Sequence, residues 1–264
     1  MSEILGRAAE LERKYDWVEA KDLYKQALPT IDEDDFLKRG EVQERVGYCL
    51  QRAAFQSGSR EEFRERMRRA IEAYEKGYGF YGELDDERGA PWMLRCKAIS
   101  KDLNHWLASD PSEKRRLLDE ALELEEKALA GFWDIGNKLE YGRTYNELPL
   151  VHYNSNILEW DKQARVRKLE KAIEWGERAI AVLSEQTAPH ETARASFTAA
   201  FYSSIFNYYY VADPEIQVQN HLKSIERLQK MVQLSERERL LPRWTKSLDL
   251  GMERHLRGRE DSAL

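Results

Sequence analysis

The sequence is poor in the residues that interrupt or cross-link a chain. Its 264 residues include only two cysteines, seven prolines and 14 glycines. Cys49 and Cys96 cannot make a disulfide framework in a chain of this size and belong to no Cys-x-x-Cys pair, so we expect two buried, reduced thiols. So few glycines and prolines exclude a many-stranded β protein, whose turns need them, and favour long helices.

An excess of basic charge and a long apolar run are also missing. The 42 Lys and Arg residues stand against 48 Asp and Glu, a net charge of -6, which argues against a phosphate backbone as the main ligand. Residues 1–7 show no basic region followed by an apolar stretch, and the uncharged segment 195–212 has too many polar side chains for hydrocarbon. We therefore expect a cytoplasmic protein that binds neither nucleic acid nor membrane.

What the sequence does have is a repeat of about 51 residues. An apolar residue recurs at intervals of 51, 51 and 52 residues, at Ile71, Leu122, Ile173 and Ile225. A small residue directly precedes each of these positions. Small or apolar residues follow seven and eight positions after that small residue, so all of them share one helical face. Candidate N-caps recur with the same spacing, at Ser59, Asp110, Asp161 and Asp213.

A second set of helices lies between the capped ones. The turn residues before them, such as Asp34-Asp35 and Gly136-Asn137, leave only short connections, which make neighbouring helices antiparallel. The pattern predicts one continuous all-α domain over residues 1–258. Its predicted units are 1–33, 34–84, 85–136, 137–187 and 188–238, followed by a capping helix at 240–257 and a frayed tail at 259–264.

The first unit resembles a tetratricopeptide repeat. Residues 16–20 read Asp-Trp-Val-Glu-Ala and are followed by Tyr24, and Ala70-x3-Tyr74-x2-Gly77 is similar to the family's Ala-x3-aromatic-x2-Ala pattern. Family units have 34 residues, so the repeats found here are longer, and the later ones lack the aromatic residue. The resemblance implies a right-handed α-α superhelix of about five antiparallel helix pairs plus the capping helix. The first helix of each pair would line a concave binding face.

Motifs that carry catalysis are missing. The sequence contains no glycine-rich phosphate loop, no Gly-x-Ser-x-Gly, no His-Glu-x-x-His and no acidic cluster at metal-ligand spacing. Asp102 and His105 lie three residues apart and could share a metal. A real site would need two or three further ligands, so a hydrogen-bonded pair is the simpler interpretation. We expect no enzyme activity, no cofactor and no metal.

The resemblance places the candidate binding residues on the first helix of each pair. Carried over through the small residues, the groove positions are Glu44, Tyr48, Gln51, Arg52, Arg95, Ile99, Asp102, Arg143, Asn146, Tyr153, Asn154, Arg194, Phe197 and Phe201. Arginine and asparagine can hold a peptide backbone or a carboxylate, and aromatic rings supply anchor area. The lysine and asparagine clamp that holds a C-terminal carboxylate in some family members is not reproduced, which disfavours that ligand class.

Two segments keep alternative interpretations open. The aromatic helix at 195–212 is either core between neighbouring helices or a set of anchors for a peptide, a hydrophobic ligand or a second copy of the chain. Pro149 occupies the small position of its helix. It either produces a tolerated kink or frees a carbonyl near Tyr145 that helps to form a pocket.

The sequence therefore predicts a non-catalytic scaffold or adaptor that binds a protein or peptide segment on the concave face of the solenoid. One alternative is a sensory or regulatory module that binds a small peptide or hydrophobic ligand near the aromatic helix 195–212. Another is a self-assembling structural oligomer. The identity of the partner, and the choice between monomer and homo-oligomer, stay open at this stage.

Overall fold

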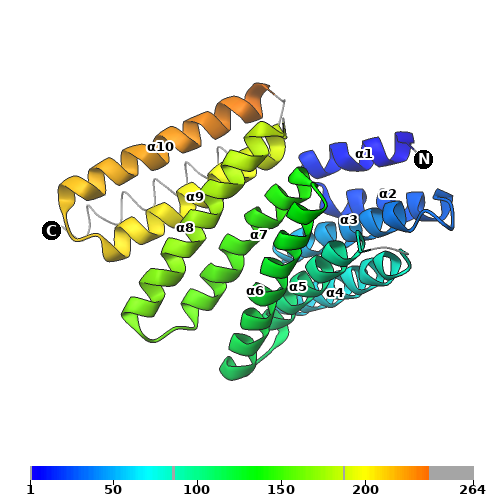
Figure 1. Ribbon diagram of the computed structural model, residues 1–264, viewed down its shortest axis with the longest axis horizontal. Helices are drawn as coiled ribbons and strands as arrows, with labels where there is room; N and C mark the ends of the chain where they lie inside the picture. Colours follow the sequence, from blue (N-terminus) through cyan, green and yellow to red (C-terminus); the bar gives the residue numbers. More distant parts are fainter. Residues whose placement is uncertain (1, 85–86, 187, 238–264) are drawn as a thin grey trace.

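The computed structural model describes residues 2–84, 87–186 and 188–237, and these residues form an all-α solenoid, as predicted (Figure 1). They contain ten α-helices, one short 3-10 helix and no strand. The helices are α1 (Ser2–Arg13), α2 (Trp17–Ala27), η1 (Leu28–Thr30), α3 (Phe36–Ala54), α4 (Arg60–Gly82), α5 (Ala90–Leu107), α6 (Pro111–Asp134), α7 (Lys138–Ile157), α8 (Lys162–Glu185), α9 (Pro189–Tyr210) and α10 (Pro214–Arg237). The predicted capping helix at 240–257 and the tail at 259–264 lie outside the described residues.

Each helix packs against the next one in the chain, and the direction alternates from one helix to the next (Figure 1). One contact departs from this order, because α7 also packs against α9 although α8 lies between them in the sequence. The helices that come first in their pairs therefore meet on one side of the stack. This arrangement brings α3, α5, α7 and α9 around a common pocket.

The predicted N-caps open the second helices of successive pairs. The side chains of Ser59, Asp110 and Asp161 accept hydrogen bonds from the backbone N–H groups three residues further on, at 3.1, 2.8 and 2.7 Å. Asp213 does the same at the start of α10, at 3.3 Å. These bonds satisfy donors that helix geometry leaves unpaired, which confirms the predicted helix starts.

Small residues at the repeated positions let neighbouring helices approach closely. Gly47 on α3 lies under the ring of Tyr74 on α4, and a Cβ atom at position 47 would lie 2.9 Å from that ring. Tyr74 is only 3% exposed. At the corresponding positions of α5 and α9, Ala98 and Ala200 are also buried. The core thus consists of interfaces between helices rather than of one central cluster.

Pro149 lies inside α7 and is buried, and the helix continues on both sides of it. Because proline has no N–H group, the carbonyl of Tyr145 cannot receive its usual intrahelical hydrogen bond. The turn before the proline supplies Arg143, Asn146 and Glu147 to the pocket described below. The helix therefore tolerates the interior proline, which lies directly beside polar functional candidates.

The aromatic helix α9 is buried on one face only. Tyr202 is 4% exposed, whereas Phe201 is 44% and Tyr209 67% exposed. The core interpretation therefore holds for one face of this helix, and the role of the exposed face stays a prediction. Within the described residues, no helix combines the length and the apolar character that crossing a membrane requires.

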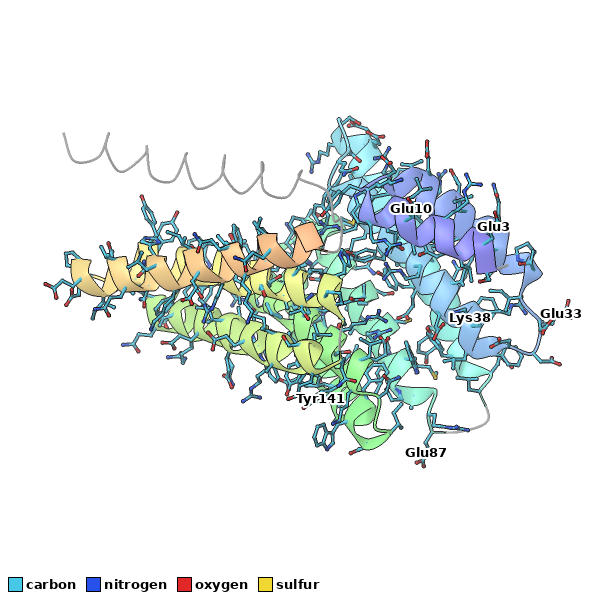
Figure 2. The ribbon with its side chains drawn as sticks, turned by 90° about the horizontal axis from the view of Figure 1, so that it is seen from above. Glu3, Glu10, Glu33, Lys38, Glu87 and Tyr141 are labelled. Atoms are coloured by element: carbon cyan, nitrogen blue, oxygen red, sulfur yellow. The ribbon has the colours of Figure 1, made fainter. Side chains whose placement is uncertain are left out.

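Charged side chains cover the outer surface and pair with one another. The ion pairs of Lys14 with Glu10 and of Arg69 with Glu65 are both 2.9 Å long and join residues four positions apart. Figure 2 shows Glu3 and Glu10 extending outward from α1. Such exposed pairs contribute little to stability, since water screens them. The charges of interest are the buried ones on the inner helices.

Candidate functional site

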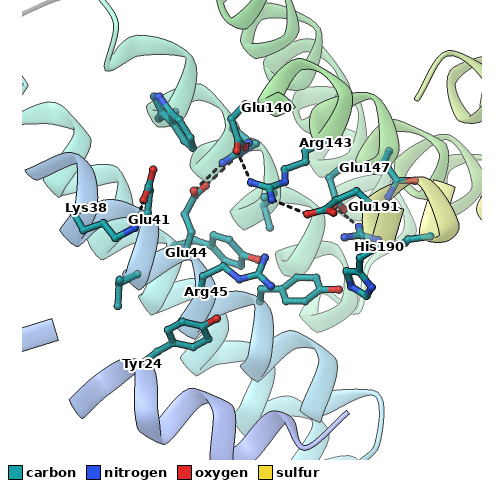
Figure 3. Close-up of a pocket in the computed structure, with 18 of the residues that line it drawn as sticks. Tyr24, Lys38, Glu41, Glu44, Arg45, Glu140, Arg143, Glu147, His190 and Glu191 are labelled. Carbon is teal, nitrogen blue, oxygen red and sulfur yellow. Dashed lines mark hydrogen bonds and ion pairs between the residues drawn. The ribbon is translucent and has the colours of Figure 1, made fainter. Parts of the chain in front are cut away.

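A pocket of about 330 Å³ lies between the N-terminal halves of α3, α5, α7 and α9 (Figure 3). This volume is at the lower end of the range typical of ligand sites. Its charged wall residues are Lys38, Glu41, Glu44, Arg45, Arg95, Glu140, Arg143, Glu147, Glu191 and Arg194, and its rings are Tyr24, Tyr48, Tyr74, Trp92 and His190. The start of α9 approaches α3 across the pocket, since the Arg194 guanidinium lies 5.5 Å from the centre of the Tyr48 ring.

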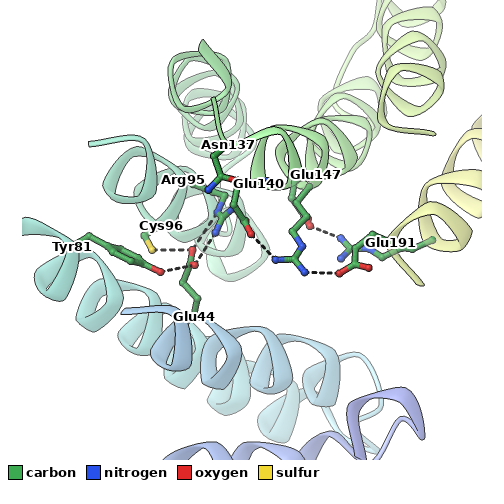
Figure 4. Close-up of polar contacts among 10 residues, drawn as sticks. Glu44, Tyr81, Arg95, Cys96, Asn137, Glu140, Glu147 and Glu191 are labelled. Carbon is green, nitrogen blue, oxygen red and sulfur yellow. Dashed lines mark hydrogen bonds and ion pairs between the residues drawn. The ribbon is translucent and has the colours of Figure 1, made fainter. Parts of the chain in front are cut away.

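Five of these residues form an alternating chain that crosses four helices, which we call the central ion-pair network (Figure 4). Glu44 on α3 accepts from Arg95 Nε at 3.2 Å and Nη2 at 2.8 Å. The remaining terminal nitrogen of Arg95, Nη1, donates to Glu140 Oε2 on α7 at 2.5 Å. Arg143 then joins Glu140, at 2.5 Å, to Glu191 at the start of α9, at 2.6 Å. The network fixes the inner helices relative to one another.

Pairing offsets the effect of burial on Arg95 and Glu140, the two central members of the network. Arg95 and Glu140 are 7% and 5% exposed. Burial alone would lower the pKa of Arg95, but Glu44 and Glu140 hold it well above the usual range. Burial alone would raise the pKa of Glu140, but Arg95 and Arg143 lower it below its ordinary value. The pairing therefore compensates the loss of water on both sides.

Further donors hold the Glu44 carboxylate in place. The hydroxyl of Tyr81 donates to Glu44 Oε2 at 2.8 Å, and the thiol of Cys96 donates to Oε1 at 3.3 Å. Burial, followed by the charge of Glu44, raises the pKa of both groups well above their ordinary values. Tyr81 and Cys96 therefore stay protonated and act as donors. Cys49 and Cys96 are both free and buried, as expected.

A second ion pair and an amide complete the polar wall. Arg194 on α9 donates to Glu147 on α7. Asn146, one residue earlier, is 5% exposed and lines the pocket, but its Oδ1 atom has no hydrogen-bond partner among the described residues. A buried acceptor without a donor is costly to the folded state.

Glu125 on α6 is a buried carboxyl of a different kind. It is 1% exposed, and its Oε2 atom finds no hydrogen-bond partner in the described part of the chain. Burial raises its pKa well above the ordinary value, and the nearby carboxylate of Glu147 raises it further, outweighing the opposite effect of Arg95. Burial therefore favours the protonated form of Glu125, which lies beside a wall of charged side chains.

Half of the predicted groove residues line this pocket. These are Glu44, Tyr48, Arg95, Ile99, Arg143, Asn146 and Arg194. The residues outside it are Gln51, Arg52, Asp102, Tyr153, Asn154, Phe197 and Phe201. All fourteen predicted residues belong to α3, α5, α7 and α9. The difference lies along the helix axes, since on each of these helices the predicted residues that line the pocket precede those that do not.

The predicted positions outside the pocket make contacts of their own. Asn154 Nδ2 donates to Asp102 Oδ1 at 3.2 Å, and both residues are buried. His105 Nδ1 lies 3.3 Å from the same carboxylate oxygen. In the described ranges no three His, Cys, Asp or Glu side chains gather in a way that could hold a metal ion. These residues form a structural polar cluster.

Four further contacts involve the remaining predicted positions. The Arg52 guanidinium lies 5.7 Å from the centre of the Trp17 ring. On α9, the rings of Phe197 and Phe201 stack with centres 6.0 Å apart, and Tyr153 on α7 approaches Phe201 to 6.2 Å. The Tyr74 hydroxyl reaches Gln51 at 3.5 Å. These contacts hold helices together.

Sequence reasoning included Glu44 but missed the other four carboxylates of the pocket wall, Glu41, Glu140, Glu147 and Glu191. Glu140 and Glu191 lie in the first turns of α7 and α9, where the positive end of the helix favours negative charge, and Glu147 lies two turns into α7. A signal was present, because positions 140 and 191 are one repeat length apart, as are 44 and 95. A search for charges that recur with the 51-residue period would have found them.

Comparisons with known proteins provide no family for this chain. No protein-family model matches it, and no curated protein matches it. Among solved structures it is similar to a de novo designed helical repeat protein at 17% identity, with 78% of this chain and all of that chain covered and a TM-score of 0.37. It is also similar to a chain described under "Computational Design of Self-Assembling Cyclic Protein Homooligomers" at 11% identity, covering 90% and 96% of the two chains, with a TM-score of 0.34. Both likenesses are weak, and the solenoid fold stands on the helix packing of the chain itself.

Proposed function

We propose that the protein is a non-catalytic scaffold that binds a peptide or protein segment in the pocket of α3, α5, α7 and α9. The observation that carries the proposal is the pocket wall itself, in which four inner helices bring tyrosine and tryptophan rings together with ion-paired guanidinium groups. Such fixed side chains form a preorganised surface, for which little ordering is needed on association.

The physical character of the pocket supports binding of a short stretch of chain. Its volume of about 330 Å³ suits a few side chains rather than a large cofactor. Four aromatic rings line it, which supply anchor area, and the guanidinium groups hold rigid positions because each is paired. The most exposed part of the wall lies on the helices that a concave groove would present.

The proposal is tested by selecting random seven-residue peptides, displayed on phage, against the full-length protein. We expect enrichment of related sequences that bind with micromolar affinity. Replacing Ile99, a pocket residue, with tryptophan should fill the pocket and abolish this binding. The same change at Ile157, which is 57% exposed and lies outside the pocket, should leave binding unchanged.

Melting temperatures of both variants control for folding. If the selected peptides bind the Ile99→Trp variant as well as the wild type, the pocket is not the binding site. If no peptide is enriched at all, the recognition proposal is wrong.

A second candidate function is self-association through the aromatic helix, favoured by the exposed rings of α9. Phe201, Tyr208 and Tyr209 are 44%, 37% and 67% exposed, a grouping that water tolerates poorly. Light scattering between 1 and 200 μM distinguishes this function from the first, since these concentrations bracket a typical weak interface. A mass that stays at 31.0 kDa over the whole range would exclude it.

We further propose that the helix pairs are tetratricopeptide-like units with lengthened helices, working in the cytoplasm. The packing of Tyr74 on Gly47 supports the first part, because it joins the aromatic and small positions on which the resemblance rests. The two free, buried cysteines suit a reducing compartment. Localisation of the tagged full-length chain in its native cell tests the second part.

A further inference from the structure

One edge of the solenoid presents an apolar residue from each of four successive helix pairs. The turns after α3, α5, α7 and α9 all lie on this edge, because the helices alternate in direction (Figure 1). At or beside the ends of these four helices, apolar residues recur at intervals of 51 residues. They are Phe55, Trp106, Ile157 and Tyr208, which we call the edge ladder. Trp106 is half-buried, whereas the other three are 45%, 57% and 37% exposed.

Contacts between neighbouring repeats hold this edge in register. Arg64 at the start of α4 donates to the carbonyl of Leu107 at the end of α5, at 3.1 Å. One repeat later, Arg115 donates in the same way to the carbonyl of Leu158, at 2.7 Å. The first two rings of the edge ladder are also in contact, with centres 5.6 Å apart. The ladder is therefore a regular, fixed line of side chains.

Trp160 extends into solvent near the middle of the same edge. It lies in the α7–α8 turn and is 94% exposed, although tryptophan is largely buried in most proteins. It borders a hollow of about 760 Å³ between the start of α6 and this turn. Pro111, Ile157 and Leu158 supply apolar surface in the hollow, and most of the remaining wall is charged. The guanidinium of Arg165, which also lines it, can stack on an aromatic ring. The hollow is thus suited to an aromatic side chain from another molecule.

The even spacing makes the edge ladder complementary to itself. A two-fold rotation about the midpoint of a row of equally spaced groups places the row on itself, so a second copy presents apolar residues at the matching interval. In this antiparallel arrangement Phe55 lies opposite the partner's Tyr208, and Trp106 lies opposite the partner's Ile157. The two-fold axis passes between the α5–α6 and α7–α8 turns, beside the hollow that Trp160 borders. A partner of unrelated sequence would need the same period by coincidence.

The exposed apolar surface on this edge is large enough for a specific interface. Besides Trp160 and three members of the ladder, it includes Tyr209, which is 67% exposed. The exposed parts of these five side chains amount to about three whole ones, or ~600 Å² per copy at roughly 200 Å² each. Two copies would bury about 1,200 Å² in all, which reaches the lower bound of stable protein–protein interfaces.

We propose that the edge ladder is a dimer interface, at which two copies of this chain pair antiparallel and each inserts Trp160 into the hollow of the other. The inference rests on self-association, the second candidate function, and gives it a surface, an orientation and an anchor residue. Tryptophan is enriched among the residues that dominate binding energy, and such residues cluster at the centre of an interface, where Trp160 would lie. The pocket proposed for peptides lies nearer the other ends of the inner helices, so dimerisation leaves it open.

Sedimentation equilibrium of the full-length protein, over the concentration range used for light scattering, measures the association. We expect the mass to rise from 31.0 kDa toward twice that value. Trp160→Glu should raise the dimer dissociation constant at least about tenfold, because it removes the anchor and places a charge beside the two-fold axis. Trp133→Glu is the matched control, since Trp133 is 61% exposed but lies at the end of α6, on the opposite edge. It should leave the constant within about twofold.

Mixed dimers test the orientation. A nitroxide is attached to the variant Gln56→Cys, at an exposed position beside Phe55, and this chain is mixed with isotope-labelled wild-type chain. Both native cysteines are buried, so the reagent modifies the introduced one. The antiparallel arrangement predicts that the label broadens the amide signals of the partner around Tyr208, in the α9–α10 turn. Signals around Phe55, in the α3–α4 turn, should keep their intensity.

The outcomes separate this inference from the function on which it rests. If the dimer persists in Trp160→Glu, or Trp133→Glu weakens it equally, the edge is not the interface, and self-association through another surface stands. Broadening confined to the α3–α4 turn would overturn the antiparallel arrangement. A mass of 31.0 kDa at every concentration would overturn both the inference and self-association. Peptide selection tests the scaffold proposal independently of all these results.

Discussion

Arg95 is the residue on which the central ion-pair network depends most, because it holds two carboxylates at once. Replacing it with methionine leaves Glu44 and Glu140 buried without their common partner. Removing one member of a buried ion pair costs about 3–5 kcal/mol, so the free energy of unfolding in urea at pH 7 should fall by that amount. The triple variant Arg95→Met, Glu44→Gln, Glu140→Gln should recover most of the loss, since it leaves no buried charge.

The pH dependence of the single variant provides a check on the cause. Unpaired buried carboxylates have raised pKa values and bind protons more tightly in the folded than in the unfolded state. The Arg95→Met variant should therefore regain stability relative to the wild type as the pH falls from 7 to 5. A loss that is equal at both pH values would point to lost packing instead of lost pairing.

His152 makes the folded protein sensitive to mild acid. Its Nε2 atom accepts a hydrogen bond from Trp175 Nε1 at 3.1 Å and must be unprotonated to do so. Burial, together with Lys171 and Lys168, lowers the pKa of His152 to about 4. Between pH 6.5 and 4 the unfolded chain binds a proton at this residue that the folded chain does not bind, so stability falls as the pH is lowered. The expected loss is about 3 kcal/mol, complete near pH 4 and absent above pH 6.5.

The contribution of His152 is separated from those of the carboxylates by comparison with His152→Gln. The glutamine oxygen can accept the same hydrogen bond from Trp175 but does not titrate. Urea unfolding of both proteins at pH 7.5, 6, 5 and 4.5 gives the difference. Parallel curves for the two proteins would show that His152 is accessible to protons in the folded state.

At the scale of the helix, two glycines with opposite surroundings test the close approach of neighbouring helices. Gly6 lies on an exposed face of α1 with no atom within 4 Å of a Cβ built there, whereas Gly47 on α3 faces the Tyr74 ring at 2.9 Å. Gly6→Ala should raise the free energy of unfolding by about 0.5–1 kcal/mol, because alanine restricts the unfolded chain. Gly47→Ala should lower it by about 1–3 kcal/mol through overpacking. Chemical denaturation measures both, and a stabilised Gly47→Ala variant would show that α3 and α4 can separate freely.

Helices could be predicted from the sequence because their signals are local. The caps at Ser59 and Asp110 and the apolar positions at 71 and 122 depend on residues a few places apart. The same local signals recur once in each repeat, which makes them easier to recognise. The ion pairs that join different helices around the pocket are harder to predict, because their residues lie far apart in the sequence. Arg95 pairs with Glu140, 45 residues away, and Arg143 with Glu191, 48 residues away, so neither pair obeys the 51-residue period.

The limits of the pocket depend on geometry that no local pattern contains. The correct helices were predicted, but positions such as Asp102 and Asn154 lie too far along them to reach the pocket. Which half of each helix lines the pocket is set by how far α9 curls back toward α3, as the contact of Arg194 with Tyr48 shows. This curvature results from small rotations added up over every helix interface. Local sequence patterns do not determine the total rotation.

At the scale of the whole molecule, the inner helices are coupled beyond nearest neighbours. In a simple repeat array each unit contacts only the next, and the unfolding free energy is a sum of local terms. Here the central ion-pair network runs from Glu44 on α3 to Glu191 on α9, and α7 packs directly on α9. The second and fifth helix pairs are therefore linked by a continuous chain of buried and half-buried contacts along the inner helices.

This coupling predicts the pattern of native-state hydrogen exchange. In the wild type, the most protected amides of α3 and α9 should open with the same free energy, as one cooperative unit. Glu140→Gln cuts the network in its middle, so protection in α9 should fall well below that in α3. Glu120→Gln, which changes a carboxylate paired with Lys101 and Arg116 near the outer surface, should leave both unchanged. Equal losses in α3 and α9 in the Glu140→Gln variant would mean that helix packing alone couples them. A peptide that spans the pocket contacts all four inner helices, so its binding to the Glu140→Gln variant should bring the two opening free energies together again.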